Sequence, residues 1–174
     1  MNSVKNFTTF QIAGIDFFII SQDDSIIKIG INEELPNEHL LIYKTPNDKL
    51  FKKCYQQLIE YFDNKRREFD FKIKINGTVF QKKVWKVLSK IPYGKTVSYQ
   101  DVAIKIKNSK AVRAVGLANK NNPLPIVIPC HRVNGKNGKL TGYASGMEIK
   151  EKLLELEKNN LEKFKKKKPS KRGS

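Results

Sequence analysis

The sequence predicts a mixed α/β chain of two units, a small α+β layer followed by a group of short helices. Apolar segments on either side of Gly14 are typical of the arms of a β-hairpin, and residues 47–62 repeat apolar side chains at a helical spacing. After residue 76, helix start and stop signals follow at short intervals instead. We therefore expect the first unit to end at residue 75.

The first unit, residues 1–75, is expected to hold the hairpin, a third strand at residues 25–31, one helix and a last strand. The helix has a stripe of residues four apart, which are Leu50, Cys54, Leu58 and Phe62. Because Cys54 lies within this stripe, we interpret it as a core residue. Alternating apolar residues at 69–75 predict the last strand. No pattern in this unit indicates chemistry.

The second unit, residues 76–162, opens with a capping-box pattern formed by Thr78 and Gln81, which predicts a helix. Pro92-Tyr93-Gly94 is expected to end it.

Two short helices follow in this unit. Ser98 predicts the cap of one, and Ser109 predicts the cap of another at residues 110–119. Two short helices joined by a tight turn predict a helix-turn-helix. The second is almost all small or apolar around Arg113, which is typical of a core helix. Its outer side, however, offers small residues that would let the backbone approach DNA closely: Ala111, Ala114 and Gly116.

Basic residues are concentrated in the second part of the chain. Residues 1–70 hold 9 Lys or Arg against 11 Asp or Glu, whereas residues 71–174 hold 25 against 6. This asymmetry favours a polyanionic partner for the second part, although charge alone does not separate nucleic acid from a ribosomal or membrane surface. Residues 163–174 hold seven basic residues and no acid, so we interpret them as a disordered electrostatic arm.

Composition excludes several classes of protein. With 174 residues and 39% hydrophobic content, the chain can form real cores. It has no apolar run long enough to span a membrane and no visible secretory signal. Its two cysteines are expected to be free thiols in a reducing compartment, so an intracellular location is expected: the cytoplasm, or the nucleus in a eukaryote. No metal is expected, because the candidate ligands lack zinc-site spacing: His39, Cys54, Cys130 and His131.

The segment "PIVIPCHRVNG" places one cysteine directly beside one histidine. Residues 126–128 predict a short interior strand, after which Pro129 forces a bend. Cys130 is then either a packed cysteine with a chance neighbour or a nucleophile beside its base, His131.

A last helix is marked by an apolar face at Ile149, Leu153, Leu156 and Leu161. Lys150 and Glu157 fall within that face, and a buried charge is costly unless it has a partner. Lys150 has a stem long enough to reach water from the edge of the face. Glu157 lies nearer the centre, and we expect His131 to be its partner.

The second unit closely resembles the O6-alkylguanine-DNA alkyltransferases, also called methylated-DNA–protein-cysteine methyltransferases. The resemblance covers about residues 77–157 with an ordered series of segments: "PYGKTVSYQDVA", "AVRAVGLANKN", "NPLPIVIPCHRV" and "GYASGMEIKEKLLELE". The first 75 residues match only in general layout. The resemblance implies a ribonuclease-H-like domain followed by a winged-helix-like domain. It also implies a monomer without a cofactor that repairs double-stranded DNA by moving one alkyl group from guanine O6, or from O4 of methylated thymine, to Cys130.

The resemblance also implies roles for single residues. The family's hydrogen-bond chain falls on Cys130, His131 and Glu157, with Asn122 bracing the turn. Tyr99 would donate a hydrogen bond to the leaving base and press the phosphate that rotates, with Lys150 as its partner.

For DNA, the resemblance implies docking in the minor groove, with Arg113 filling the gap left by a flipped guanine. The base pocket would use the backbone at Cys130 and Val133 and a wall from Tyr143 to residue 146. Ala144 and Ser145 depart from the family's usual serine–glycine or glycine–glycine pair. We expect Ser145 to narrow the pocket against benzyl-type groups.

Three other classes share some of these features. A cysteine hydrolase uses the same residue types, but papain-like and caspase arrangements separate Cys and His widely in sequence. An alkyltransferase-like protein that only binds lesions lacks the reactive thiol. A winged-helix regulator has no need of a buried Cys-His-Glu set.

Overall fold

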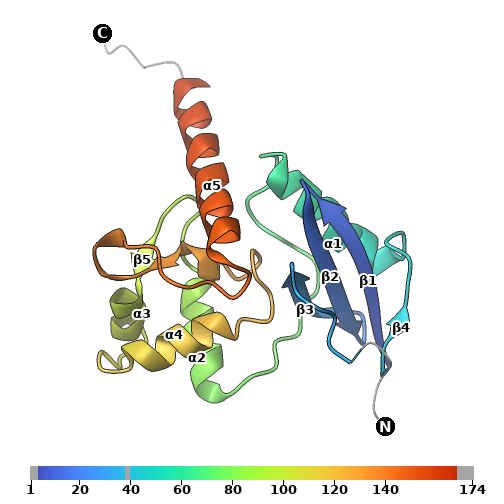
Figure 1. The fold of residues 1–174 in the computed structure, drawn as a ribbon, viewed down its shortest axis with the longest axis horizontal. Helices are drawn as coiled ribbons and strands as arrows, with labels where there is room; N and C mark the ends of the chain where they lie inside the picture. Colours follow the sequence, from blue (N-terminus) through green and yellow to red (C-terminus); the bar gives the residue numbers. More distant parts are fainter. Residues whose placement is uncertain (1–3, 38–39, 168–174) are drawn as a thin grey trace.

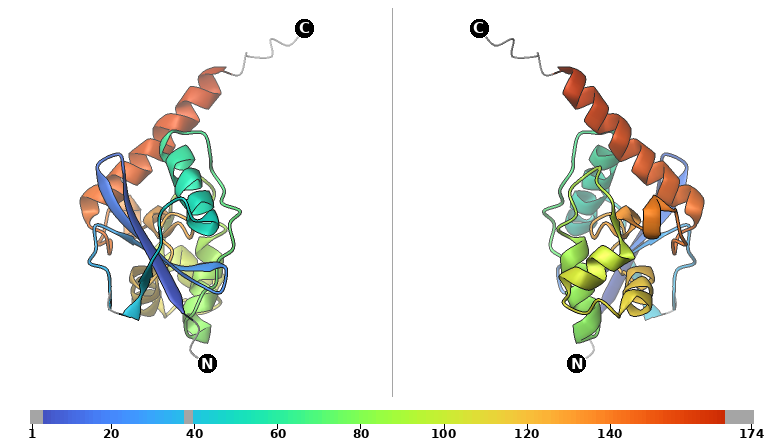
Figure 2. Two further views of the ribbon diagram at one scale, coloured as in Figure 1. Left: turned by 90° about the vertical axis from the view of Figure 1, so that its right-hand side faces the viewer. Right: turned by 90° about the vertical axis from the view of Figure 1, so that its left-hand side faces the viewer.

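The computed structural model describes residues 4–37 and 40–167, so His39 and the end of the basic tail lie outside the described residues. The sheet and α1 form one lobe, and the short helices form a second lobe beside it (Figure 1). Helix α5 runs out beyond both lobes when the molecule is viewed from either side (Figure 2). The elements in chain order are β1 (Lys5–Ile12), β2 (Ile15–Gln22), β3 (Ser25–Ile31), β4 (Ile42–Tyr43), α1 (Lys49–Phe62), α2 (Val79–Leu88), β5 (Val97–Ser98), α3 (Tyr99–Lys105), α4 (Val112–Lys120), η2 (Cys130–Arg132), β6 (Val133–Asn134), η3 (Lys136–Gly138) and α5 (Met147–Lys167).

The sheet has the strand order β3-β2-β1-β4. The predicted hairpin is confirmed: β1 and β2 are antiparallel, and Ala13 and Gly14 both have positive φ, as a tight two-residue hairpin turn requires. Strand β4, which pairs parallel with β1, was not predicted because it is only two residues long and exposed.

The two faces of β2 are both apolar, since successive side chains of a strand point to opposite sides. Phe17 and Ile19 face the main core, while Phe18 and Ile20 belong to a smaller cluster on the other face. The main core continues from α1 through the second unit to α5, so the two predicted units share one hydrophobic core.

The buried face of α1 differs from the predicted stripe by a small rotation. Cys54 and Leu58 are fully buried as expected, but Tyr61 rather than Phe62 completes the buried face. A spacing of three or four residues fits a period of 3.6, so both choices were compatible with the sequence.

The predicted strand at residues 69–75 is wrong. This segment makes a single bridge, at Ile73, to Ile26 of β3. Farther along β3, the amide of Ile29 donates to the carbonyl of Pro123 from the second unit. The free edge of β3 is therefore shared by two segments, which leaves no room for a longer strand pairing.

The helix caps of the second unit are confirmed at Thr78 and at Ser98, both with complete capping boxes. The cap at Ser109 is wrong. Helix α4 begins at Val112, because the amide of Ala111 still closes a turn on Asn108. Ser109 instead accepts a hydrogen bond from Gln100 through its carbonyl oxygen.

Helix α5 continues to Lys167, past Lys163, where the disordered arm was predicted to begin. No glycine or proline interrupts the chain between Met147 and Lys167, so nothing in the sequence stops the helix there. Residues 168–174 of the predicted arm lie outside the described residues.

Candidate active site

Cys130 is delivered by a tight turn, so the predicted interior strand at residues 126–128 is wrong. Ile126 has φ of 72°, a strained value for a β-branched residue, and the amide of Ile128 donates to the carbonyl of Leu124. Prolines at 123, 125 and 129 remove backbone donors, so the apolar run is buried without forming a ladder.

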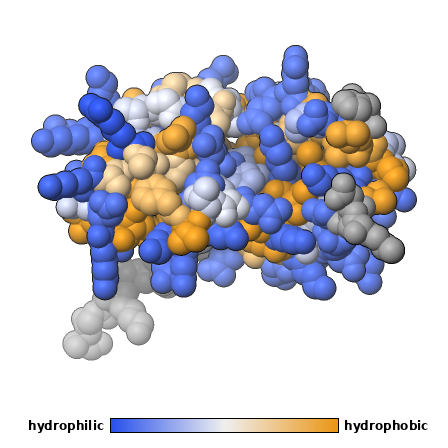
Figure 3. Space-filling view, turned by 90° about the horizontal axis from the view of Figure 1, so that it is seen from below, coloured by the Kyte–Doolittle hydropathy of each residue, from blue (hydrophilic) through white to orange (hydrophobic). Residues whose placement is uncertain are grey.

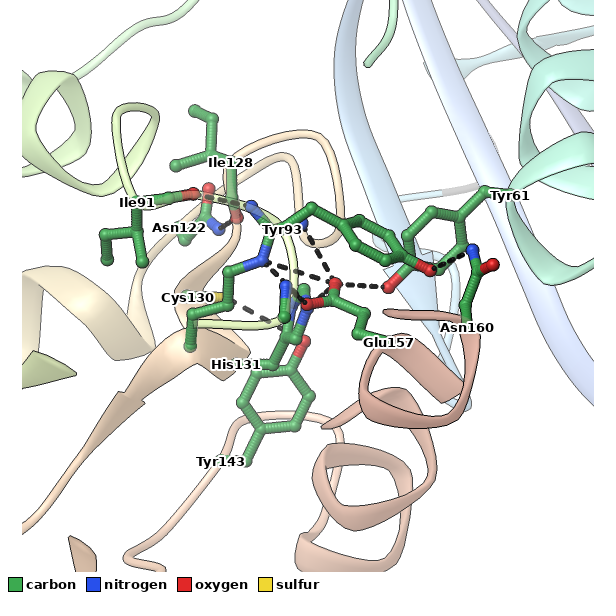
Figure 4. Close-up of polar contacts among 12 residues, drawn as sticks. Tyr61, Ile91, Tyr93, Asn122, Ile128, Cys130, His131, Tyr143, Glu157 and Asn160 are labelled. Carbon is green, nitrogen blue, oxygen red and sulfur yellow. Dashed lines mark hydrogen bonds and ion pairs between the residues drawn. The ribbon is translucent and has the colours of Figure 1, made fainter. Parts of the chain in front are cut away.

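Asn122 braces this turn at both ends, as the resemblance implied. Its side-chain amide donates to the carbonyl of Ile128 at 2.7 Å, and its side-chain oxygen accepts from the amide of Leu124 at 3.0 Å. The turn leads directly into η2, in which Cys130, His131 and Arg132 follow one another and are all buried. Figure 4 shows Asn122 holding Ile128 just before Cys130.

The Cys130 thiol is only 3% exposed and lies 3.8 Å from the Tyr143 hydroxyl oxygen. Burial raises the pKa of Cys130, and its hydrogen bonds with Asn122 and Tyr143, together with the charge of Lys150, offset part of that rise. The thiol therefore carries its proton at rest. It becomes a nucleophile only if a base removes the proton.

His131 lies against Glu157, as the position of Glu157 on the apolar face predicted. His131 Nε2 is 2.7 Å from Glu157 Oε1, and both side chains are fully buried. A carboxylate only accepts hydrogen bonds, so Nε2 carries the proton of the neutral ring and Nδ1 carries the free lone pair. Nδ1 has no hydrogen-bond partner among the described residues, so it is the atom able to accept a proton.

Arg132 is the residue that sequence reasoning missed most clearly. Its Nη2 lies 2.9 Å from Glu157 Oε1, its Nε lies 3.0 Å from Oε2, and its Nη1 donates to the carbonyl of Ile91 at 2.7 Å. Burial alone would raise the pKa of Glu157, but His131 and Arg132 outweigh burial and lower it to about 2. The position of Arg132 directly after His131 was visible in the sequence, but its burial, which makes it need an acid, was not.

Two further donors reach Glu157 from other parts of the chain. The backbone amide of Gly94, which has a positive φ of 70°, donates to Oε2 at 2.8 Å. The hydroxyl of Tyr61, from α1, donates to Oε1 at 2.7 Å (Figure 4). Sequence patterns could not pair Tyr61 with Glu157, because 96 residues separate them.

Lys150 is fully buried rather than reaching water, and it ties the segment after η2 to α5. Its Nζ donates to the carbonyls of Val133 and Thr141, at 2.6 and 3.2 Å. Burial lowers the pKa of Lys150. A carbonyl oxygen has two lone pairs, so that of Val133 keeps one for another donor. Tyr143, Ala144 and Ser145 form the turn before α5, closed by the bond from the Gly146 amide to the Tyr143 carbonyl.

The other predicted site residues stand apart from this network, on α3 and α4. Tyr99 is the first residue of α3 and packs partly into the core. Arg113 and Ala114 are exposed on α4, Ala111 is half-buried, and a side chain at Gly116 would meet open space. No hydrogen bond within residues 4–37 and 40–167 joins Tyr99 or Arg113 to the Cys130 network, so the structure supplies two separate groups.

A cavity of about 440 Å³ borders two predicted site residues, Asn122 and Ala144, together with Glu33 and Lys120. Viewed from below, hydrophilic side chains protrude over both lobes around hydrophobic areas (Figure 3). In the part of the chain that the structure describes, no three His, Cys, Asp or Glu side chains are grouped as a metal site. None of the described helices is long and apolar enough to cross a membrane.

Comparison with known proteins matches both parts of the chain to models of one family. Residues 16–75 match the ribonuclease-like domain of 6-O-methylguanine DNA methyltransferase, and residues 79–159 match its DNA-binding domain. A methylated-DNA–protein-cysteine methyltransferase of Methanosarcina barkeri is 56% identical over 66% of this chain and 73% of its own. The constitutive enzyme of that name from Bacillus subtilis is 43% identical over 87% of this chain and 94% of its own.

Solved structures agree with this assignment. The O6-methylguanine methyltransferase of Mycobacterium tuberculosis superposes with a TM-score of 0.83 at 36% identity, covering 92% of this chain and 99% of its own. A structure of the same organism's OGT in complex with DNA superposes with a TM-score of 0.81 at 38% identity, and the match covers 89% of this chain and 94% of that chain. The predicted ribonuclease-H-like and winged-helix-like architecture is thereby confirmed, and the chain belongs to the 6-O-methylguanine DNA methyltransferase family.

Proposed function

We propose that this chain repairs double-stranded DNA by moving the alkyl group from O6 of an alkylated guanine to Cys130. The observation that carries the proposal is the buried sequence of Cys130 and His131, with His131 Nε2 held 2.7 Å from Glu157 Oε1. The names of the relatives, methylated-DNA–protein-cysteine methyltransferases, support the reaction. The complex of a related protein with DNA supports the partner.

The geometry supports a single displacement step. Nδ1 of His131 accepts the thiol proton of Cys130, directly or through one water, and the buried carboxylate of Glu157 stabilises the imidazolium. Sγ then attacks the alkyl carbon in line, so that a carbon–sulfur bond forms as the carbon–O6 bond breaks. The electron pair remains on guanine, which takes up a proton, and Tyr99 is proposed to donate a hydrogen bond to it. Because the thioether has no group here to hydrolyse it, each chain acts once.

Access to the base requires it to leave the duplex, because a stacked base cannot reach a buried thiol. Arg113, exposed near the start of α4, is proposed to fill the vacated stack from the minor groove. Small or open positions beside it support a close approach of the α4 backbone to DNA: Ala111, Ala114 and Gly116. The pocket is proposed to lie between Val133 and the turn at residues 143–146, and a methyl group on O4 of thymine is a second proposed substrate. A location in the cytoplasm, or in the nucleus of a eukaryote, follows from this substrate.

Intact-mass analysis after incubation with DNA containing O6-methylguanine tests the proposal. We expect one methyl group per chain, and peptide mapping should place it on Cys130. The buried Cys54, whose pKa is raised by burial, should carry none. A label on Cys54, or more than one turnover per chain, would contradict the assignment. Binding to lesion DNA with no mass change would favour a protein that only recognises lesions.

A further inference from the structure

We propose that Tyr61, which the first unit contributes to the site, acts through Glu157 to keep His131 neutral, because Tyr61 and His131 share one oxygen of that carboxylate. Its effect on alkyl transfer rests on the proposed function, but its effect on the protonation of His131 does not. The two can therefore be tested separately.

The geometry places both side chains on the same oxygen atom. Tyr61 lies on the last turn of α1 and is fully buried. Its hydroxyl reaches Glu157 Oε1 at 2.7 Å, the same distance at which His131 Nε2 lies from that oxygen (Figure 4). The Tyr61 ring is held edge-on against Tyr93 and Phe62, at 6.0 and 5.5 Å between ring centres. The hydroxyl is thus fixed on Oε1 by packing.

Tyr61 can act only as a donor in this position. Burial, followed by the neighbouring charge of Glu157, raises the pKa of Tyr61 well above its ordinary value. The hydroxyl therefore keeps its proton at neutral pH, where it withdraws negative charge from Oε1.

The orientation of the Glu157 carboxylate does not depend on Tyr61. Arg132 holds both oxygens of Glu157, and the amide of Gly94 holds Oε2. A carboxylate oxygen offers about two lone pairs, yet Oε1 faces three close donors, from Tyr61, His131 and Arg132. Each hydrogen bond that Oε1 accepts weakens the other hydrogen bonds to the same oxygen. The distinct contribution of Tyr61 is therefore to the charge that His131 experiences.

The charged groups of the described residues that act on His131 are consistent with this proposal. Burial lowers the pKa of His131, the hydrogen bond and charge of Glu157 raise it, and the charges of Arg132 and Lys150 lower it. Among the described residues, the other ionisable neighbours of the network are the phenols and the thiol, Tyr61, Tyr93, Tyr143 and Cys130, together with Arg67, whose guanidinium lies 5.2 Å from the centre of the Tyr93 ring. Removing the Tyr61 hydroxyl leaves more negative charge on Glu157 Oε1, which stabilises the protonated form of His131. The pKa of His131 should then rise.

Nuclear magnetic resonance of the imidazole measures this directly, because the sequence holds only two histidines. In a His39→Gln background, Tyr61→Phe is expected to raise the pKa of His131 by roughly half to one pH unit, a fraction of one charged hydrogen bond. The matched control is Tyr55→Phe, which removes a hydroxyl from the same helix where the ring packs on Phe10 at 4.7 Å. The control should leave the His131 titration unchanged.

A second variant tests the proposal independently if Tyr61→Phe destabilises the fold. Thermal melts of the variant and the unmodified protein would reveal such a destabilisation. Replacing Tyr61 by 3-fluorotyrosine keeps its shape but makes the hydroxyl a stronger donor, so the pKa of His131 should fall. Unchanged titrations in both variants would overturn the proposal, as would shifts of the same sign.

The rate of transfer from free O6-benzylguanine or O6-methylguanine gives the functional readout. Because neutral His131 is the proposed base, the rate should drop on acidification, and Tyr61→Phe should move that drop to higher pH by the same amount. If the unmodified protein transfers no alkyl group, the proposed function fails while the titration still judges Tyr61. If it transfers normally and the drop does not move, only the role of Tyr61 is wrong.

Discussion

Arg132→Met is the substitution with the largest expected effect on folding, because it leaves Glu157 buried without its cationic partner. The Arg132 side chain is 7% exposed and Glu157 is 0% exposed, so water cannot replace the lost contacts. Removing one partner of a buried ion pair costs about 3–5 kcal/mol, and the orphaned carbonyl of Ile91 adds about 1 kcal/mol or more. Methionine keeps much of the side-chain volume, so packing loss should be the smaller part. We expect a loss of about 4–6 kcal/mol in the free energy of unfolding.

Urea unfolding followed through the single, buried tryptophan, Trp85, measures this loss. The matched control is Arg66→Met, which breaks an ion pair with Glu60 at 2.6 Å whose partners are each 28% exposed. The control should cost under about 1 kcal/mol.

Adding Glu157→Gln to Arg132→Met removes the stranded charge. The double variant should therefore lose at least about 1 kcal/mol less than the sum of the two single variants. A loss below about 1 kcal/mol for Arg132→Met, or strict additivity in the double variant, would refute the reasoning.

Four further predictions concern acid stability, DNA and substrate range. The pKa of Glu157 is lowered to about 2 in the folded chain, so the ionised carboxylate contributes its full stability above pH ~4.5 and this contribution should be lost towards pH ~2. Urea unfolding across that range should show a fall in the free energy of unfolding, and Glu157→Gln should make this fall smaller. Arg113→Ala should slow repair of duplex DNA roughly ten- to a hundredfold, since unstacking costs a few kcal/mol, yet react almost normally with free O6-methylguanine. Ser145→Gly should raise the rate with O6-benzylguanine more than with O6-methylguanine, in competition assays. Deleting the chain from Lys165 should flatten the salt dependence of DNA binding, measured by anisotropy, without changing transfer to the free base.

Each of these has a clear contrary outcome. An acid curve that Glu157→Gln leaves unchanged would mean that other groups govern acid stability. Equal slowing of duplex and free base by Arg113→Ala would assign Arg113 to the pocket. Equal rates for Ser145→Gly and the unmodified chain with the benzyl substrate would leave Ser145 without a role in size selection. Equal salt slopes would show that the deleted segment does not contact phosphates.

Local signals in the sequence predicted the local structure well. The hairpin at Gly14 and the capping boxes at Thr78 and Ser98 depend on residues within a few positions of one another, so their chemistry can be read along the chain. The same applies to Glu157, because its position among leucines at a helical spacing is enough to bury it. That burial, with His131 as partner, was the part of the site accessible without the fold.

The failures arose where distant segments compete for the same backbone groups. Residues 69–75 alternate as a strand should, but Pro123 occupies the neighbouring position on the edge of β3. Residues 126–128 are apolar because Ile126 and Ile128 pack into the core, and the surrounding prolines make this segment turn instead of extending. Hydrophobic periodicity in a sequence indicates which side chains are buried. It indicates pairing of a β-strand only when the segment has backbone N–H donors and a sheet offers it a free edge.

Glu157 shows why an adjacent Cys-His pair is not sufficient for this site. Its two oxygens are bound by donors from four places: α1, the loop after α2, and two successive residues of η2. Only the two in η2 lie within two residues of the nucleophile in the sequence. If the charge on Glu157 sets the basicity of His131, as we propose, then the first unit influences the reactive thiol although none of its described residues forms a hydrogen bond with that thiol. A substitution in α1 at Tyr61 should then change the pH dependence of transfer, whereas one at Tyr55 on the same helix should not.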